Sequence, residues 1–205
     1  MKNNRKNDKI EFKIITIGDT IVGKTSIIRR YIENAFDEEI IQTVGIQKTK
    51  KKIKLKNGEE VFLNLCDTMG QERYKSMNKN YVRNADAVLL VFDLNNIKTF
   101  NNVKTWIDFL YDSNSGKENI LKYLIGNKKD LPQEVENEKI ELFLKEHKDF
   151  TYKATSAKIE DNQISELFQE MGEKLFRNYK KIDKKSMKKI KLRSGESGSS
   201  CCLTE

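Results

Sequence analysis

The spacing of hydrophobic positions changes along the chain, and these changes predict alternating strands and helices. Residues 11–17 form a short β-branched run typical of a strand, and apolar residues spaced over 27–32 follow the pattern of one helix face. Residues 46–56 then alternate apolar residues with lysine, Asn57-Gly58 has the chemistry of a hairpin turn, and residues 60–66 continue as a strand. The last two strands are therefore expected to pair antiparallel.

Later segments complete the alternation. Residues 85–92 and 120–125 are short and nearly all apolar, which is typical of parallel strands covered on both faces, and a last strand is predicted over 150–154. Helical spacing predicts four further helices, over residues 74–81, 97–111, 134–146 and 162–179. The alternation indicates a doubly wound α/β fold, in which ligands bind at the carboxyl ends of the strands.

Four lysines share one face of the strand over 46–56. Lys48, Lys50, Lys52 and Lys54 recur with a period of two, so their side chains should point the same way. We interpret this face as the solvated side of an edge strand, in preference to a binding patch, because charged residues commonly protect an exposed sheet edge.

The net charge of +8 is gathered at the two ends of the 205-residue chain. Residues 10–179 hold 27 basic and 27 acidic residues, whereas residues 1–9 and 180–205 are both basic. We therefore expect a basic N-terminal extension, one domain over 10–179, and a flexible basic tail over 180–205. A neutral body suits nucleic acid poorly, and a basic tail suits an anionic membrane surface. A nucleic-acid binder acting through its lysine-rich ends is the less favoured alternative.

Cysteine and histidine usage narrows the chemistry. Cys66, Cys201 and Cys202 are too few for a disulfide framework, no apolar stretch approaches the roughly 20 residues of a membrane span, and no signal peptide is evident. We therefore expect a cytosolic protein. The single histidine, His147, lies among charged residues at the end of a predicted helix, so we interpret it as a solvated side chain and not as a catalytic one.

A glycine-rich segment connects the first predicted strand to the first predicted helix. Its sequence, GDTIVGKT over residues 18–25, matches the P-loop pattern in the structural context that the pattern requires, which disfavours a merely structural turn. Glycines let backbone N–H groups face phosphates, Lys24 can reach the β and γ phosphates, and the Thr25 hydroxyl can bind Mg²⁺. The residues expected to contact a nucleoside triphosphate here are Thr20, Ile21, Val22, Gly23, Lys24, Thr25 and Ser26.

A second polar segment, NKKD over residues 127–130, follows the strand predicted over 120–125 and indicates which base is bound. The Asp130 carboxylate can accept two hydrogen bonds from the N1–H and exocyclic amine of guanine, and adenine offers no matching donors. Such a run is weak when it stands alone, because polar turns are common. After a P-loop at this distance it predicts a guanine nucleotide and excludes an ordinary ATPase.

Together these motifs resemble those of the Ras-superfamily small GTPases, most closely the Rab branch, over about residues 10–179. The segments that favour Rab proteins are residues 73–77, 81–85 and 90–94. The resemblance implies a P-loop NTPase fold with a mostly parallel six-stranded sheet, one antiparallel strand, and helices on both faces. It also implies a switch that binds GTP or GDP with Mg²⁺ and hydrolyses GTP slowly.

The resemblance assigns roles around the phosphates. In the run DTMGQ over residues 67–71, Asp67 would hold Mg²⁺ through water, the Gly70 amide would sense the γ-phosphate, and Gln71 would orient the attacking water. Thr43 would bind Mg²⁺ and the γ-phosphate. The implied catalytic residues are thus Gln71, Lys24 and Thr43, and the implied metal ligands are Thr25, Thr43 and Asp67.

The resemblance also assigns the base-binding residues. Phe36 would contact the guanine, and the run TSAK over residues 155–158 would place the Ala157 amide against the guanine oxygen. The full implied set is Phe36, Asn127, Lys128, Asp130, Ser156, Ala157 and Lys158.

Two adjacent cysteines near the end of the chain, Cys201 and Cys202, resemble the double-geranylgeranylation site of Rab proteins. Residues 202–205 formally fit a prenylation box, but Thr204 and the terminal Glu205 match it poorly. The implied location is the cytosolic face of an endomembrane. The implied partners are an exchange factor, a GTPase-activating protein, a GDP-dissociation inhibitor or escort protein, geranylgeranyl transferase and GTP-dependent effectors, and the protein is expected to be monomeric and not to bind nucleic acid.

The sequence departs from the family pattern beside the phosphates and on the effector face. Ile21 replaces a small P-loop residue and Met69 replaces an alanine, so a GTP-binding scaffold with little hydrolysis is the alternative function. No arginine stands inside the motifs, which predicts slow turnover and a need for an activating partner. Lys48, Cys66 and Tyr81 stand where many Rab proteins carry Phe, Trp and Tyr, which predicts a divergent set of effectors.

Overall fold

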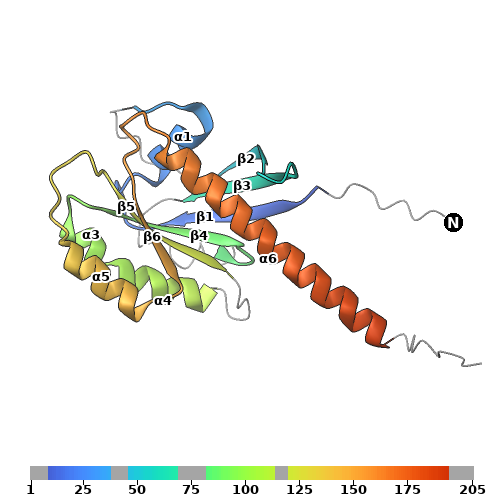
Figure 1. Cartoon of the computed structure of the whole chain (residues 1–205). Coiled ribbons are helices and arrows are strands. Elements are labelled where there is room, and N and C mark those ends of the chain that lie inside the picture. Colours follow the sequence, from blue (N-terminus) through green and yellow to red (C-terminus); the bar gives the residue numbers. More distant parts are fainter. Residues whose placement is uncertain (1–8, 38–45, 69–81, 114–119, 194–205) are drawn as a thin grey trace, which may run out of the picture.

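A computed structural model describes residues 9–37, 46–68, 82–113 and 120–193. Within these residues the chain forms one six-stranded sheet with helices on both faces (Figure 1). No helix in this part of the chain is long and apolar enough to cross a membrane.

The sheet has the strand order β2-β3-β1-β4-β5-β6. Its strands are β1 (Glu11–Ile17), β2 (Ile46–Lys54), β3 (Glu60–Thr68), β4 (Ala87–Asp93), β5 (Leu121–Asn127) and β6 (Phe150–Ala154). Only the β2–β3 pair of these is antiparallel, and the other neighbours pair in parallel. This confirms the predicted mixed sheet, and it brings the carboxyl ends of β1, β3, β4, β5 and β6 to one edge.

The helices divide between the two faces of the sheet (Figure 1). Helices α1 (Lys24–Glu33) and α6 (Gln163–Arg193) cover one face, and α3 (Ile97–Asn101), α4 (Val103–Ser113) and α5 (Asn137–Glu146) cover the other. Each face has its own hydrophobic cluster. Neighbouring residues of β1 show the division, since Ile14 belongs to the α1/α6 cluster and Ile15 to the α3/α4/α5 cluster.

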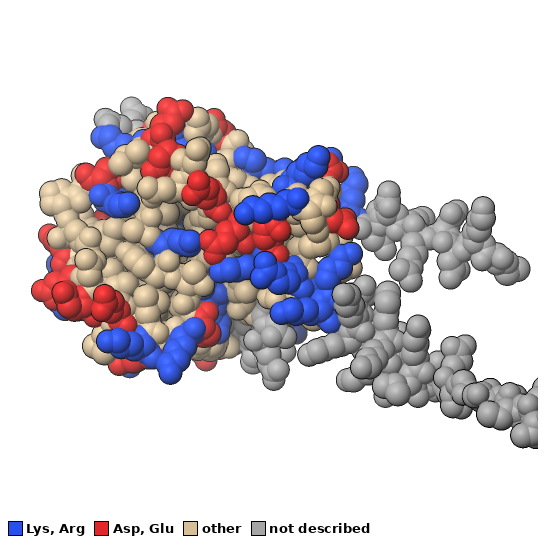
Figure 2. Space-filling model, viewed as in Figure 1, with Lys and Arg blue, Asp and Glu red and all other residues tan. Residues whose placement is uncertain are grey.

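Strand β2 lies at the edge of the sheet, as predicted. Lys48, Lys50, Lys52 and Lys54 are all exposed, which confirms the solvated face. Lys50 forms an ion pair with Glu11 on β1, and Lys52 with Glu60 on β3. On the visible face of the molecule acidic and basic groups are intermixed, and basic groups gather at the right of the view (Figure 2).

Three helix predictions differ from the structure. The helix expected over 97–111 is two helices with a break at Asn102, whose side-chain amide turns toward Asp19. Helix α5 begins three residues later than predicted, because the Glu134 and Val135 amides donate to the Leu94 carbonyl. A further predicted helix, over 74–81, lies outside the described residues and is not one of these three.

The third difference is the length of α6. It was expected to end at residue 179, with a flexible basic tail beyond, and it continues to Arg193. Residues 180–193 contain no glycine or proline, and seven of the fourteen are lysines, which favour a helix, whereas glycine and serine dominate from Ser194 onward. The lysine-rich part of the expected tail is therefore helical.

Candidate nucleotide-binding site

The P-loop connects the carboxyl end of β1 to the first residue of α1 and passes close to two neighbouring elements. Gly18 has a φ of +137°, and a Cβ there would lie 2.1 Å from the Val91 carbonyl oxygen of β4. Gly23 has a φ of +91°, and its Cβ would lie 2.2 Å from Nδ2 of Asn127. Both positions of the pattern therefore require glycine for conformation and for space.

Lys24 is buried at the start of α1, with 5% of its surface exposed. Its ammonium group donates hydrogen bonds to the carbonyl oxygens of Gly18, at 2.9 Å, and Asp19, at 2.5 Å. Burial lowers the pKa of this amine to about 8, although the carboxylates of Asp67 and Asp19 act in the opposite direction. A buried ammonium group of this kind would be stabilised by an anionic ligand such as a phosphate.

Thr25 and Asp67 lie side by side, as the predicted metal site requires. The Thr25 hydroxyl donates to Oδ2 of Asp67 at 2.5 Å, and the Thr16 hydroxyl donates to Oδ1 of the same carboxylate at 3.1 Å. Asp67 is almost fully buried. Hydroxyl and carboxylate oxygens are the hard ligands that Mg²⁺ prefers, so these two residues fit that ion.

The rest of the coordination shell would come from elsewhere. No group of three or more His, Cys, Asp or Glu side chains in the described part of the chain could hold a metal by itself. Mg²⁺ commonly takes one or two protein carboxylates and completes its shell with water and substrate phosphates. Thr43, the third predicted ligand, lies outside the described residues.

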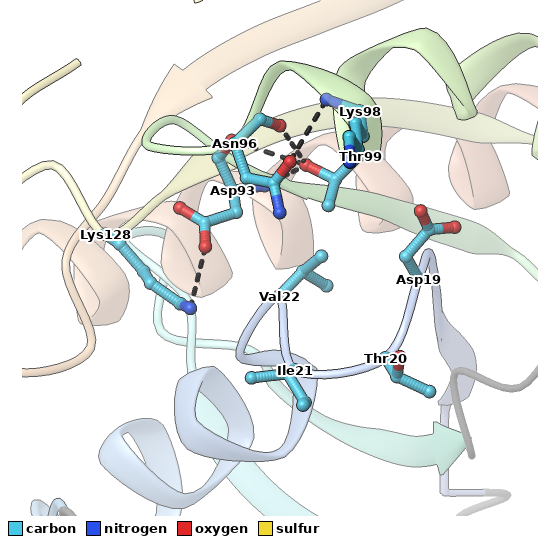
Figure 3. Close-up of a pocket in the computed structure, with 9 residues that line it drawn as sticks. All are labelled: Asp19, Thr20, Ile21, Val22, Asp93, Asn96, Lys98, Thr99 and Lys128. Atoms are coloured by element: carbon cyan, nitrogen blue, oxygen red, sulfur yellow. Dashed lines mark hydrogen bonds and ion pairs between the residues drawn. The ribbon is translucent and has the colours of Figure 1, made fainter. Parts of the chain in front are cut away.

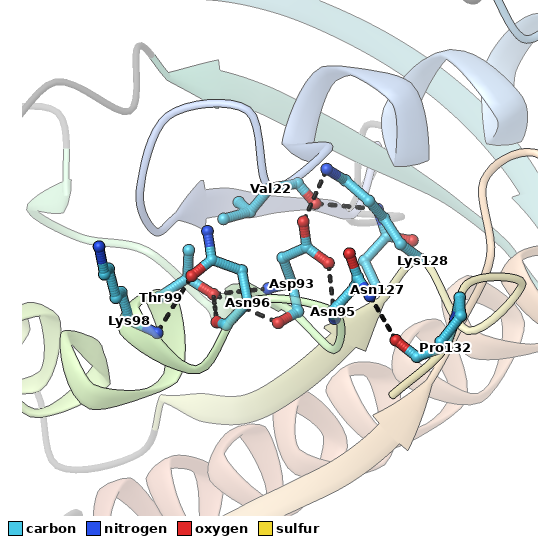
Figure 4. Close-up of polar contacts among 9 residues, drawn as sticks. All are labelled: Val22, Asp93, Asn95, Asn96, Lys98, Thr99, Asn127, Lys128 and Pro132. Carbon is cyan, nitrogen blue, oxygen red and sulfur yellow. Dashed lines mark hydrogen bonds and ion pairs between the residues drawn. The ribbon is translucent and has the colours of Figure 1, made fainter. Parts of the chain in front are cut away.

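Asn127 joins three segments of the site. Its Nδ2 donates to the Val22 carbonyl of the P-loop at 2.9 Å (Figure 4). Its Oδ1 accepts a hydrogen bond of 3.2 Å from the Thr155 hydroxyl. The side chain is fully buried. Asn127 therefore ties the P-loop to the NKKD segment and to the loop that follows β6.

Asp130 and Ser156 face each other across these last two segments. The Ser156 hydroxyl donates to Oδ1 of Asp130 at 2.5 Å, and Asp130 is exposed. Ala157 is buried next to Ser156. The structure thus brings together Asp130, Ser156 and Ala157, three of the residues that sequence analysis assigned to the base.

Arg30 holds the loop after β6 in place, and sequence analysis did not identify it. Its guanidinium group donates to the carbonyl oxygens of Ala157 at 2.9 Å, Lys158 at 3.1 Å and Asn34 at 2.9 Å. Only 8% of its surface is exposed. One signal could have found it: Arg30 lies three residues after Ile27, on the apolar face of α1, where an arginine must satisfy its donors internally.

A hollow of about 380 Å³ lies between the P-loop and the turn that follows β4 (Figure 3). Four residues predicted to contact the nucleotide line it, namely Thr20, Ile21, Val22 and Lys128. Lys128 has a φ of +63°, and its amine forms a 2.7 Å ion pair with Asp93 at the end of β4. The other lining residues are Asp19, Asp93, Asn96, Lys98 and Thr99.

The turn after β4 is fixed by its own polar contacts (Figure 4). The Asp93 amide donates to the Thr99 hydroxyl at 3.0 Å, and the Asn96 side chain caps α3 by accepting from the Lys98 amide at 3.1 Å. This wall of the hollow is therefore an ordered part of the fold. Asp93 was not identified from the sequence as a partner of Lys128.

The remaining predicted residues have varied positions. Phe36 is half-buried and packs against the hydrophobic cluster that contains Ala157, and Ser26 is half-buried in the first turn of α1. Gly70, Gln71, Cys201 and Cys202 lie outside the described residues.

His147 ends α5 as predicted, but its ring packs against Phe143, with 4.4 Å between ring centroids, so it is not simply solvated.

Comparison with known proteins agrees with this geometry. The model of the Ras family matches residues 13–177. Ras-related protein Rab-5B of Plasmodium falciparum (isolate 3D7) is 34% identical over 181 residues, covering 88% of this chain and 84% of that protein. Ras-related protein Rab-7L1 of Rattus norvegicus is 36% identical over 171 residues, covering 82% and 83%, and Ras-related protein Rab-10 of Caenorhabditis elegans is 37% identical over 150 residues, covering 72% and 73%.

The length of chain that these matches cover and their sequence identity together show the family. The match to the Ras family model begins in β1 and ends within α6, so it includes the P-loop, the NKKD segment and the loop after β6. Members of this family hydrolyse GTP. The chain therefore belongs to the Ras family of small GTPases, and its relatives named here are Rab proteins.

Proposed function

We propose that this GTPase binds GTP and GDP with Mg²⁺, hydrolyses GTP slowly, and acts as a membrane-attached switch in vesicular traffic. One observation carries the proposal. The buried Lys24 amine, the Thr25–Asp67 pair and the Asp130–Ser156 pair all lie at the carboxyl edge of the sheet, where a phosphate, a metal and a base can be bound together.

Lys24 and the P-loop amides would hold the phosphates. Thr25, Thr43 and Asp67 would hold Mg²⁺, which when bound neutralises charge on the β and γ oxygens. Gln71 would orient the attacking water, and the Gly70 amide would respond to the γ-phosphate. The protein's contribution to hydrolysis is thus positioning and electrostatic stabilisation.

Guanine would be selected by Asp130 and the Ala157 amide. Phe36 and the stem of Lys128 would flank the base, and Ser156 and Lys158 would complete the loop. Asn127 acts on this arrangement indirectly, because its amide is already bonded to Val22 and Thr155.

A second candidate function is a GTP-binding scaffold with little hydrolysis. The observation that favours it is Ile21, which is 50% exposed on the P-loop at the edge of the hollow. Lys24, Thr25 and Asp67, which catalysis requires, are assembled all the same. Single-turnover hydrolysis of bound GTP separates the two functions, because a scaffold would retain GTP unchanged.

Membrane attachment would use lipids on Cys201 and Cys202. One lipid chain anchors a protein marginally and two anchor it stably, and each basic residue near an anionic surface adds on the order of 1 kcal/mol. The lysine-rich residues 180–193 would supply this electrostatic part. Geranylgeranyl transferase, an escort protein and a GDP-dissociation inhibitor would handle the tail, while an exchange factor and a GTPase-activating protein would set the nucleotide state.

Two experiments test the proposal. Purified protein should bind GTP and not ATP, and Gln71→Leu should lower GTP hydrolysis while leaving GTP binding near normal. Replacing Cys201 and Cys202 by serine should move the protein from membranes to the soluble fraction of cells. Binding of ATP, or unchanged membrane fractionation of the cysteine variant, would contradict the nucleotide or the lipid part respectively.

The effectors are expected to differ from those of a typical Rab protein. Lys48 and Cys66 are cross-strand partners in the β2–β3 pair, where Lys48 is exposed and Cys66 is 2% exposed. Aromatic anchors at an interface are commonly worth about 2 kcal/mol or more, and this pair offers none. Generic Rab effectors should therefore bind the GTP form weakly, and the Lys48→Phe, Cys66→Trp double variant should bind them more tightly.

A further inference from the structure

The side chain of Asp19, the second residue of the P-loop, is held by the helical segment that follows β4. The Trp106 indole N–H donates to Oδ1 at 2.6 Å, and the Asn102 amide donates to Oδ2 at 2.7 Å. Trp106 lies in α4 and is 3% exposed, and Asn102 lies at the break before α4. Each oxygen of the carboxylate thus has its own donor from a segment more than 80 residues away in the sequence.

The backbone of the same residue contacts Lys24. The Asp19 carbonyl oxygen accepts one of the two carbonyl hydrogen bonds of the Lys24 amine, and the Gly18 carbonyl accepts the other. A single residue therefore connects helix α4, through its side chain, to the phosphate-binding lysine, through its main chain. No residue of the NKKD segment or of the loop after β6 takes part in this connection.

The hydrogen bonds of the Asp19 side chain restrain the P-loop just after Gly18. Gly18 has no side chain and adopts a positive φ, so nothing at that residue itself fixes the direction of the following peptide. Two charge-assisted hydrogen bonds to the next side chain supply that restraint, and such bonds are about twice as strong as neutral ones. Moving Asp19 would leave a carboxylate unpaired beside a buried indole, which is costly.

We propose that Asp19 is a positioning residue that sets the affinity of the P-loop for nucleoside phosphates, and that Trp106 is coupled to occupancy of the phosphate site. This inference rests on the proposed nucleotide binding. A nucleotide would draw the Lys24 amine toward its phosphates and so weaken the hydrogen bond that the Asp19 carbonyl accepts. A shift of the Asp19 backbone would in turn alter the hydrogen bond between its carboxylate and Trp106. Trp106 is the only tryptophan of the chain, so all tryptophan emission of the protein comes from this residue.

The test uses the full chain, with GDP as the ligand. In Asp19→Asn an amide replaces one carboxylate oxygen, so one of the two donors faces another donor. Trp106→Phe removes the indole N–H and keeps an aromatic ring. Ser113→Ala is the matched control, because the Ser113 hydroxyl makes a buried 2.7 Å bond to the Phe109 carbonyl within α4 and does not face the P-loop.

We expect Asp19→Asn and Trp106→Phe each to weaken GDP binding about tenfold, as loss of one charge-assisted hydrogen bond can do. The double variant should lose little more GDP affinity than either single variant, because both changes remove the same contact between Asp19 and Trp106. Addition of GDP should change the Trp106 emission of the wild type and of Ser113→Ala, and change that of Asp19→Asn much less. Asn102→Ala carries the same expectation for GDP affinity should Asp19→Asn fail to fold.

The opposite pattern would overturn the inference. If the variants are less stable to unfolding but bind GDP within twofold of the wild type, the contact only stabilises the fold. Losses of affinity that add in full in the double variant would show that the two residues act separately. A wild type that binds no GDP at all would overturn the proposed function itself, and the inference with it.

Discussion

The Ser156 hydroxyl donates its proton to Asp130 across a distance of 2.5 Å. Its oxygen also accepts hydrogen bonds from the backbone amides of Lys158 and Ile159, both at 3.2 Å. A serine hydroxyl has one proton and two lone pairs, so these two amides leave Asp130 as the recipient of the proton. Ser156 therefore orients the Asp130 carboxylate through Oδ1 and leaves Oδ2 of Asp130 available for a base.

The first prediction concerns the base. Asp130→Asn should change the preference from guanine to xanthine nucleotides, because the amide offers a donor where the carboxylate offers only acceptors. Loss of the matched pair of hydrogen bonds should weaken GDP binding at least about a hundredfold. Competition between GDP and XDP measures the change. Equal binding of the two nucleotides by the wild type would contradict the role given to Asp130.

The second prediction concerns Arg30. Arg30→Met keeps most of the apolar stem but leaves the carbonyls of Ala157, Lys158 and Asn34 without their donor. Of these three residues Ala157 is buried, and an unsatisfied buried carbonyl costs about 1 to 3 kcal/mol. The free energy of unfolding should therefore fall by about that amount, and guanine nucleotides should bind more weakly.

A neighbouring residue supplies the control for Arg30. Arg29 is 40% exposed in its side chain and pairs with Glu33 and Asp37, which are themselves about half exposed. Exposed ion pairs contribute little, so Arg29→Met should change stability by no more than about 1 kcal/mol. Denaturant unfolding of both variants gives the comparison, and equal losses would argue against a special role for Arg30.

Much of the fold and part of the site could be predicted because their signals are local in the sequence. The P-loop is eight consecutive residues, and the antiparallel β2–β3 pair follows from alternating lysines and a two-residue turn. Chemical complementarity to phosphate and guanine then depends on residue type alone, so Lys24 and Asp130 could be assigned before any geometry was known.

The contacts that hold these motifs could not be predicted in the same way. Arg30 bonds a carbonyl 127 residues away, and Trp106 bonds a side chain 87 residues away. Carbonyl acceptors carry no sequence signature, since every residue has one. The extension of α6 was missed for a different reason: the basic composition of residues 180–193 suggested a tail, although the same residues have good helix propensity.

The third prediction is a pH dependence of the nucleotide-free protein. The pKa of the Lys24 amine falls from its usual 10.5 to about 8 on folding because of burial. At pH values below about 8 the Lys24 amine is protonated in both the folded and the unfolded protein, so the cost of burying its charge is fully present. Above that pH the folded state releases its proton first, so the unfolded state binds more protons and stability rises with pH.

The expected rise is about 2 kcal/mol between about pH 7 and pH 9.5. Measurements should stop there, since burial raises the pKa of Tyr31 to about 12 and ionisation of such tyrosines lowers stability at higher pH. Urea unfolding across this range tests the sign. Lys24→Met should lack the rise, and a wild type that loses stability over the same range would refute the assignment.

The last prediction concerns Ile21. This β-branched residue has a φ of +64°, a conformation that costs an L-residue roughly 1 to 2 kcal/mol and that glycine adopts freely. Comparing Ile21→Gly with Ile21→Ala isolates the backbone, because both variants remove the half-exposed side chain. The glycine variant should be the more stable by about 1 kcal/mol, measured by thermal or denaturant unfolding. The same pair of substitutions at Lys104, which is exposed within α4, should give the usual order, with alanine more stable than glycine by about 1 kcal/mol. Ile21→Ala more stable than Ile21→Gly would show that the P-loop backbone is not strained at this residue.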